Sequence, residues 1–367
     1  MPRNIPRNLT RRFPFKHSAL ALTALAIAFA AGCASAPKEE PAPKTAVFYP
    51  PPPDAPRLQF LTSFSDATSL VTTKSSFAEF VVGTEQEEEA PGTLHAPYGI
   101  ATYNGKLYIC DIPCCVHVYD LVNKGYTRLG RPDTFFGPVN INIDADGTKY
   151  VCDTQKSLVF VFDANDHHVA TFGDPNRCAP IDLAIAGDEL YVCNIKKSNI
   201  EVWSKSNGEL LRSFSSKGLE PDQLRSPTNI AVGPDGNLYV TDTELCSVKV
   251  FTPEGKLTKL IGEPGDRPGY FARPKGIAID PDGVMYVADA QWEIIQLFTT
   301  EGKTLLYFGG TAAGPEGMGL PAGVTLDTSC LPAFEKYLAP GFKPKYLLFV
   351  ANQFGNNKTA SMPSAAK

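Results

Sequence analysis

The sequence predicts an all-β fold, a six-bladed β-propeller built from four-stranded antiparallel blades. A unit recurs that starts at a proline, runs through an apolar strand and a turn, and continues into a second strand of the form Tyr-Val-small-Asp/Asn. The Asp or Asn that closes this second strand returns at intervals of 42, 41, 48, 47 and 63 residues. Four short strands in a repeat of this length are typical of a propeller blade. The closing residues are Asp111, Asp153, Asn194, Asp242, Asp289 and Asn352.

Turn residues support the division of each unit into hairpins. Asp146-Gly147, Asp235-Gly236 and Asp282-Gly283 stand between the first two strands of their units, and Asp-Gly pairs favour tight hairpins because glycine readily adopts positive φ. A single blade cannot bury both of its faces, so neighbouring blades must cover it and the ring must close.

The sixth unit, which begins at Pro321, is irregular. It carries an insertion, residues 328–345, between its first two strands, and a polar segment follows Asn352. We therefore expect its outer strands to be missing and residues 57–64, an apolar segment before the first repeat, to complete the last blade and close the ring. On this interpretation the propeller covers residues 57–356, and residues 357–367 form a disordered tail.

Residues 1–32 predict an export signal. This segment contains five basic residues and no acidic one, and its apolar run from Ser18 to Ala31 is too short to span a bilayer. The sequence Ala30-Ala31-Gly32-Cys33 resembles the bacterial lipobox, which implies cleavage before Cys33 and acylation of its thiol. An ordinary cleaved secretory signal is the alternative.

Residues 33–56 are rich in proline and predict an extended tether between the lipidated cysteine and the folded body. The expected location is extracytoplasmic, with the body in the periplasm or at the cell surface. Ala34, rather than Asp, follows the cysteine and favours the outer membrane. Loss of the signal would change the net charge from −5 to −10, so we expect no nucleic-acid partner.

The repeated pattern resembles the NHL-repeat family of six-bladed β-propellers over residues 90–355. That resemblance implies that ligands approach the face formed by two sets of loops, those between second and third strands and those between blades. The closing Asp residues lie at this face. We interpret the ring of Asp111, Asp153, Asp242 and Asp289 mainly as turn caps, because an Asx side chain that ends a strand often accepts backbone N–H bonds. A charged funnel is the alternative.

A second set of candidate residues follows the proline of each blade. Tyr98 and Lys275 come directly after it, and Asn140, Asp182 and Asn229 stand one position later. Oxygen ligands in three consecutive blades suit Ca²⁺. The pattern is similar to that of gluconolactonase-type propellers, which hold a divalent metal near this place. In those proteins the Asn stands one position before a Gly, whereas here Asn140, Asp182 and Asn229 stand at the position of that Gly. Ca²⁺ is therefore the cofactor that the sequence suggests, and a structural role of these residues in the turn is the alternative.

Eight cysteines remain after Cys33 is set aside. Cys110, Cys152 and Cys193 share one repeat position and read as small buried side chains. The other candidates for thiols on the ligand face are Cys114, Cys115, Cys178 and Cys246. Disulfides, a soft-metal site and free thiols all remain open.

These observations favour a membrane-anchored binding or scaffold module for a protein or peptide partner over an enzyme. The first alternative is a metal-dependent hydrolase or lactonase with Ca²⁺ or Zn²⁺. The second is a redox partner that acts through the thiols of the ligand face. We find no catalytic nucleophile arrangement, phosphate-binding loop or three-histidine zinc set in the sequence.

Overall fold

The computed structural model describes residues 46–70, 89–113, 115–311, 314, 316–355 and 357–365, all within the compact unit Ala46–Lys367. The expected signal peptide, Cys33, residues 34–45 of the expected tether and Cys114 lie outside the described residues, so lipidation stays a prediction. The last part of the expected tether, residues 46–56, differs from an extended spacer, because Phe48 and Tyr49 form a short strand that pairs with residues 58–59. In the described part of the chain, no helix is long and apolar enough to cross a bilayer.

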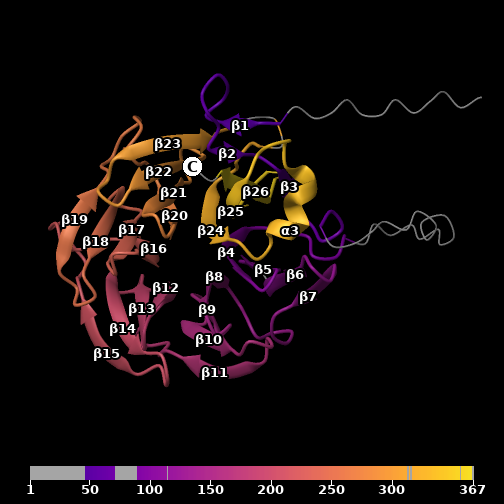
Figure 1. Cartoon of the computed structure of the whole chain (residues 1–367). Coiled ribbons are helices and arrows are strands. Elements are labelled where there is room, and N and C mark those ends of the chain that lie inside the picture. Colours follow the sequence, from indigo (N-terminus) through magenta and orange to yellow (C-terminus); the bar gives the residue numbers. More distant parts are fainter. Residues whose placement is uncertain are drawn as a thin grey trace, which may run out of the picture. The chain divides into compact units, whose positions relative to one another are not determined.

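Five four-stranded antiparallel sheets follow one another along the chain, each with its strands in sequence order, and form blades of a ring (Figure 1). Blade 1 contains β4 (Pro97–Tyr103), β5 (Lys106–Asp111), β6 (Cys115–Asp120) and β7 (Gly125–Arg128). Blade 2 contains β8 (Pro138–Ile143), β9 (Lys149–Asp153), β10 (Leu158–Phe162) and β11 (His168–Phe172). Blade 3 contains β12 (Pro180–Ala186), β13 (Glu189–Asn194), β14 (Asn199–Ser204) and β15 (Leu210–Phe214).

Blade 4 contains β16 (Pro227–Val232), β17 (Leu238–Asp242), β18 (Ser247–Phe251) and β19 (Leu257–Ile261). Blade 5 contains β20 (Pro274–Ile279), β21 (Val284–Asp289), β22 (Ile294–Thr299) and β23 (Thr304–Gly309). The Asp-Gly turns lie where the sequence predicted them, and Gly147, Gly236 and Gly283 have φ values of 86°, 78° and 81°. The prediction of an all-β propeller with four-stranded antiparallel blades is confirmed.

Each blade buries its faces against its neighbours. The aromatic residues near the end of the third strands form the centre of these contacts, because all of them are fully buried. They are Tyr119, Phe162, Trp203, Phe251 and Phe298. Full burial of a side chain of this size contributes about 1.5–3 kcal/mol relative to exposure, so the packing between blades is a major source of stability.

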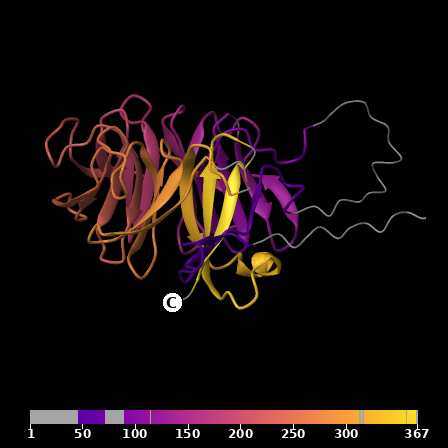
Figure 2. The ribbon, with the colours of Figure 1, turned by 90° about the horizontal axis from the view of Figure 1, so that it is seen from above.

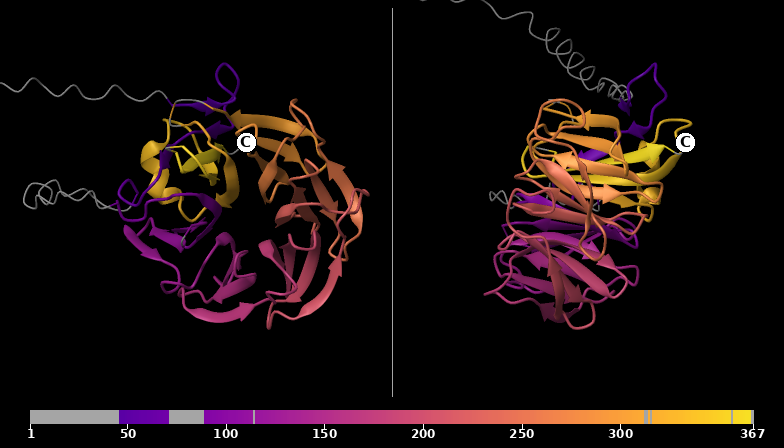
Figure 3. Two further views of the ribbon diagram at one scale, coloured as in Figure 1. Left: turned by 180° about the vertical axis from the view of Figure 1, so that it is seen from behind. Right: turned by 90° about the vertical axis from the view of Figure 1, so that its left-hand side faces the viewer.

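A sixth sheet combines both ends of the described chain. It contains β1 (Phe48–Tyr49), β2 (Leu58–Gln59), β3 (Thr62–Phe64), β24 (Pro321–Asp327), β25 (Pro344–Asn352) and β26 (Thr359–Ala365). The strand order is β1-β2-β26-β25-β24, and β3 also pairs with β26. Its innermost strand β24 contacts both β20 and β4. Figure 3 shows this sheet from behind, between the first and fifth blades.

The C-terminal segment differs from our expectation. We expected residues 357–367 to be a disordered tail, but β26 pairs with β25 along most of its length and takes the third place in the sheet. The N-terminal strands pair with β26 instead of with β25. The physical reason is that β25 would otherwise present an open edge, and backbone pairing needs no apolar pattern in the added strand.

The predicted insertion between the first two strands of this sheet is present. It contains the short helix α3 (Leu331–Phe334) and a 3₁₀ turn (Glu335–Tyr337). Phe334 is buried and packs at 5.6 Å, ring centroid to ring centroid, against Phe349 of β25. In the side view of Figure 2, α3 lies below the sheets, on the side of the turns that join first and second strands. We call this side the turn face and the opposite side the loop face.

Candidate functional site

The Asp ring at the loop face has the turn-capping role. Asp111 accepts hydrogen bonds from the backbone N–H groups of His95 and Ala96, both at 2.7 Å. Asp153, Asp242 and Asp289 make the corresponding bonds in their blades. Each carboxylate is fully buried, so these four residues join blades 1, 2, 4 and 5 to the loops that precede them and do not form an exposed funnel.

The third residue of each innermost strand faces the neighbouring innermost strand. In blades 1 and 5 and in the sixth sheet it is a glycine, and a Cβ at Gly276 would come within 2.1 Å of the carbonyl oxygen of Ala322. In blade 2 the side chain of Asn140 donates a hydrogen bond to the carbonyl oxygen of Ile181 at 3.0 Å. The space between two neighbouring innermost strands therefore decides whether this position holds Gly or the larger Asn or Asp.

Asp182 is the centre of a polar network across three blades. Its carboxylate accepts hydrogen bonds from Asn142 Nδ2 at 2.8 Å, from Asn229 Nδ2 at 3.2 Å and from the backbone N–H of Ile230 at 3.1 Å. Asn229 Oδ1 is buried without a hydrogen-bond partner in the described part of the chain. Asn140, Asp182 and Asn229 are thus close together, but all three side chains already bond to other protein groups in the way a structural link requires.

Burial raises the pKa of Asp182 to about 7, despite the hydrogen bonds that favour its charged form. A carboxyl whose pKa is higher in the folded than in the unfolded state stabilises the fold fully below its unfolded pKa. This contribution is lost as the pH rises through the folded pKa. The protonated Asp182 side chain therefore stabilises the folded state at pH 4. Above pH 7 its ionised form destabilises the folded state relative to a neutral side chain of the same shape.

We expect Asp182→Asn to remove this pH dependence, because an amide keeps the shape of the side chain without its charge. Between pH 5 and pH 8, the free energy of unfolding of the wild type should fall by about 2–3 kcal/mol relative to that of the variant. Denaturant unfolding of both proteins at the two pH values measures this. A wild-type-minus-variant difference that stays constant with pH would show that Asp182 is ionised throughout.

Tyr98 and Lys275 lie at the loop-face end of the central channel. The Lys275 Nζ atom lies 4.8 Å from the centre of the Tyr98 ring and donates a hydrogen bond to Gln353 Oε1 at 2.9 Å. Both side chains are at least nine-tenths buried, and Tyr98 packs in one cluster with Val139 and Ile181. Burial, and secondarily the charge of Arg273, lowers the pKa of Lys275 to about 8. These residues form a plug rather than an open ligand pocket.

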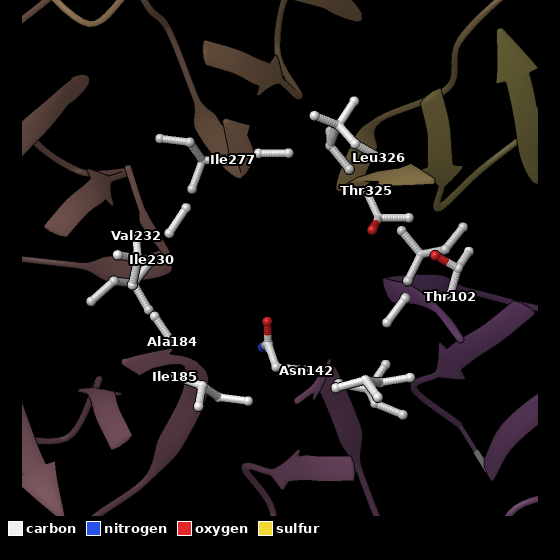
Figure 4. Close-up of a pocket in the computed structure, with 16 residues that line it drawn as sticks. Thr102, Asn142, Ala184, Ile185, Ile230, Val232, Ile277, Thr325 and Leu326 are labelled. Carbon is white, nitrogen blue, oxygen red and sulfur yellow. The ribbon is translucent and has the colours of Figure 1, made fainter. Parts of the chain in front are cut away.

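Below this plug the channel contains a cavity of about 360 Å³ lined by the innermost strands of all six sheets (Figure 4). Its wall is mostly aliphatic, with Ile230, Ile277 and Leu326 among the residues labelled in the figure. The polar side chains in the wall are Thr102, Asn142 and Thr325. This wall offers few groups that could orient a polar ligand.

The cysteine candidates are dispersed, and the structure describes six of them as free thiols: Cys110, Cys152, Cys178, Cys193, Cys246 and Cys330. Burial raises the pKa of Cys178 and of Cys246, so both are protonated at neutral pH. Because the thiolate is the reactive form, this environment does not favour the redox hypothesis. Cys110, Cys152 and Cys193 are fully buried, as their shared repeat position predicted.

A buried network in blade 1 escaped the sequence analysis. His117 Nε2 lies 3.3 Å from Asp111 Oδ2 and 3.4 Å from Cys115 Sγ, and its Nδ1 lies 2.9 Å from the Tyr126 hydroxyl. The alternation of side chains along a strand, with Cys115 and His117 two residues apart, could have indicated it. The thiol, imidazole and carboxylate are each at most 6% exposed, so a substrate cannot reach them in this arrangement.

The loop face also carries exposed apolar side chains on four separate loops. Phe136 and Leu219 lie in loops between blades and are 67% and 72% exposed. Trp292 and Phe354 lie in loops after β21 and β25 and are 42% and 60% exposed. The sequence analysis did not select them, because exposure of a loop residue cannot be read from the repeat pattern. Exposed aromatic residues are typical anchors at protein interfaces.

Comparison with known proteins places the fold among β-propellers. The NHL-repeat family model matches residues 224–251, within blade 4. No protein with a curated description matches the sequence.

Several solved structures resemble the whole ring at low sequence identity. An auxiliary nutrient binding protein from Bacteroides ovatus has a TM-score of 0.57 at 12% identity, with 85% of this chain and 77% of that chain covered. A protein of unknown function from Bacteroides thetaiotaomicron has a TM-score of 0.58 at 16% identity, covering 84% and 76%. A streptogramin B lyase has a TM-score of 0.52 at 14% identity, covering 74% and 84%. Likeness at this identity shows the fold alone, and the chain is accordingly a β-propeller that carries an NHL repeat.

Proposed function

We propose that this protein is a lipid-anchored, extracytoplasmic binding module whose loop face holds a protein or peptide partner. The observation that carries the proposal is the set of exposed apolar side chains on that face, contributed by loops from different parts of the ring. The polar candidates of the same face are committed to structural hydrogen bonds, as in the case of Asp111 and Asp182.

The proposal includes a closed ring of six blades. The sheet that joins β24–β26 to the N-terminal strands is its sixth blade, because β24 contacts the innermost strands on both sides. A closed ring presents its loops on a rigid frame, and rigid placement lowers the entropic cost of binding. The chain enters this frame at β1. There the aromatic ring of Phe48 lies 5.9 Å, centroid to centroid, from the aromatic ring of Phe342, which belongs to the insertion on the turn face. A tether that leaves from there directs the loop face away from the membrane.

A photocrosslinking experiment tests the loop face. A photoreactive phenylalanine analogue replaces Phe136 or Trp292 on the loop face. Leu260 and Tyr307 on the outer strands are the matched control positions, because each of these side chains is 53% exposed. We expect irradiation of cells to give a discrete crosslinked species from the loop-face positions and none from the outer strands. Equal products from both sets, or products from the outer strands alone, would contradict the proposal.

A further inference from the structure

A groove with a cavity volume of about 680 Å³ lies between β7 of blade 1 and the outer strands of blade 2. The chain as a whole has a net charge of −5, yet three cationic side chains line this groove. The cations are Arg128, Arg131 and Lys156, and the carboxylates in the same walls are Asp133 and Asp166. The balance between these charges decides which ligand the groove attracts.

Two of the cations, Lys156 and Arg131, belong to loops of the loop face. The Lys156 Nζ atom donates hydrogen bonds to the carbonyl oxygens of Asp133 and Thr134, at 2.8 and 2.7 Å, and lies 5.6 Å from the centre of the Phe160 ring. An ammonium group has three N–H donors, so one N–H remains beyond these two bonds. The Arg131 side chain is exposed, and within the described part of the chain its guanidinium has no hydrogen-bond or ion-pair partner.

The carboxylates of the groove do not cancel these charges. Asp166 pairs with the fully buried ammonium group of Lys149 at 2.8 Å and with Lys106 at 3.2 Å. Its charge is therefore balanced by groups other than the three cations of the groove. Asp133 is then the remaining carboxylate against three cations, so the walls carry a net positive charge at neutral pH.

The junction of blades 2 and 3 contains an internal anion at the corresponding place. Glu201 of β14 and Phe160 of β10 hold the same strand position, because each pairs with the valine of the neighbouring second strand. Glu201 is 1% exposed and accepts a hydrogen bond at 2.7 Å from Nη1 of Arg177, in the preceding loop. Blade 2 has the uncharged Phe160 at this position, so the loop cation Arg131 meets no such carboxylate there.

Another cavity also contains its own counterion. It is lined by Leu58, Asp280 and Tyr346, where blade 5 meets the sixth sheet. Lys345 pairs with Asp282 at the rim of this cavity and lies 6.0 Å from the centre of the Tyr346 ring. The groove between blades 1 and 2 differs from it, because the cations in its walls outnumber the carboxylates.

From these contacts we propose that the groove between blades 1 and 2 binds the phosphate group of a phosphorylated molecule. Guanidinium groups match the oxygens of a phosphate bidentately, and an ammonium group adds a point charge. The cavity has the size of a small-molecule site, so it has room for the body of the ligand beside Phe160. None of the four exposed apolar side chains of the loop face lines the groove, so this site is separate from the proposed partner surface. The same phosphate chemistry belongs to a soluble molecule and to a lipid headgroup.

Isothermal titration calorimetry of the purified full-length protein in mild detergent at pH 7 tests the site with sn-glycerol 3-phosphate. Glycerol, which lacks the phosphate, and glycerate, which has a carboxylate in its place, are the matched probes. We expect one site for glycerol 3-phosphate, weaker binding of glycerate by about fivefold or more, and no binding of glycerol. The affinity for glycerol 3-phosphate should fall as salt is added, because salt screens exposed charges. No binding of glycerol 3-phosphate, or equal affinity for glycerate, overturns the proposal.

Dihexanoyl phosphatidic acid distinguishes the two sources of the phosphate group, with dihexanoyl phosphatidylcholine as the control for partition into detergent. Binding about tenfold tighter than that of glycerol 3-phosphate supports a lipid headgroup. Equal or weaker binding supports a soluble phosphorylated molecule.

Two arginine variants localise the binding. Arg131 and Arg267 begin the same turn in two loops between blades, because each precedes a proline and its carbonyl oxygen accepts the backbone N–H of the third residue that follows, at 3.1 and 2.9 Å. Both side chains are exposed, but only Arg131 lines the groove. Arg131→Gln should weaken glycerol 3-phosphate by about tenfold or more, whereas Arg267→Gln should leave its affinity unchanged. Both variants should keep the thermal stability of the wild type, since exposed side chains contribute little to it. Unchanged affinity in Arg131→Gln, or an equal loss in both variants, would contradict the assignment.

Discussion

Replacement of Gly276 by alanine is expected to lower the free energy of unfolding by about 3 kcal/mol or more. The added Cβ would lie 2.1 Å from the carbonyl oxygen of Ala322 and 3.0 Å from the backbone nitrogen of Val324. Both atoms belong to the backbone of β24, so relief of the clash requires the two innermost strands to separate. Overpacking in a well-packed interior costs about 1–3 kcal/mol even where side chains can adjust.

Thermal and denaturant unfolding of Gly276→Ala and Gly323→Ala measure the effect. Gly323 provides an independent test, because its Cβ would lie 2.2 Å from the carbonyl oxygen of Tyr98, in the innermost strand on the other side of β24. Gly125→Ala is the control, since the nearest atom to its Cβ is Asp120 Cβ at 3.8 Å. Stability close to wild type in both variants would mean that the ring is not closed through β24.

The second large effect is expected for Phe64→Ala. Phe64, the last residue of β3, is 4% exposed and packs edge-on against the ring of Tyr119, with the centroids 5.9 Å apart. It thereby joins the N-terminal segment to the core of blade 1. Truncation of a buried phenylalanine costs about 3–5 kcal/mol, and here it should also loosen the strand that covers the edge of β26.

Urea unfolding checks this prediction against Val169→Ala, a truncation on an outer strand where the side chain is 58% exposed. The control should change stability by less than about 0.5 kcal/mol. We also expect Phe64→Ala to aggregate more readily, since an uncovered edge strand can pair with another chain. A small loss of stability without aggregation would show that the N-terminal strands contribute little to closure.

The repeat pattern was sufficient to predict the five regular blades and their turns. Each blade depends on local features that repeat in the sequence, such as the Asp-Gly turn at Gly236 and the aromatic residue near the end of a third strand, Phe251. The third strand of the last sheet was not predictable in this way. Residues 359–365 carry no apolar pattern, and their pairing with β25 follows from the open edge that only the assembled ring presents.

The candidate site was predictable in position but not in role. Asn140, Asp182 and Asn229 do come together at the inner strands, as the repeat implied. Whether such side chains hold a metal or link two strands depends on distances between blades, which the sequence does not encode locally. The same limit applies to the cavity lined by Leu58, Asp280 and Tyr346, because it exists only where blade 5 and the sixth sheet meet.

The measurement that tests the central claim most directly is a native mass spectrum of the full-length protein extracted from the membrane fraction in mild detergent. We predict a chain that begins at Cys33, carries acyl groups and retains a second polypeptide, and we predict that serine at both Trp292 and Phe354 releases this polypeptide while the anchor stays intact. An unmodified chain in the soluble fraction, or a membrane-bound chain whose only added mass is a metal ion, would contradict the account.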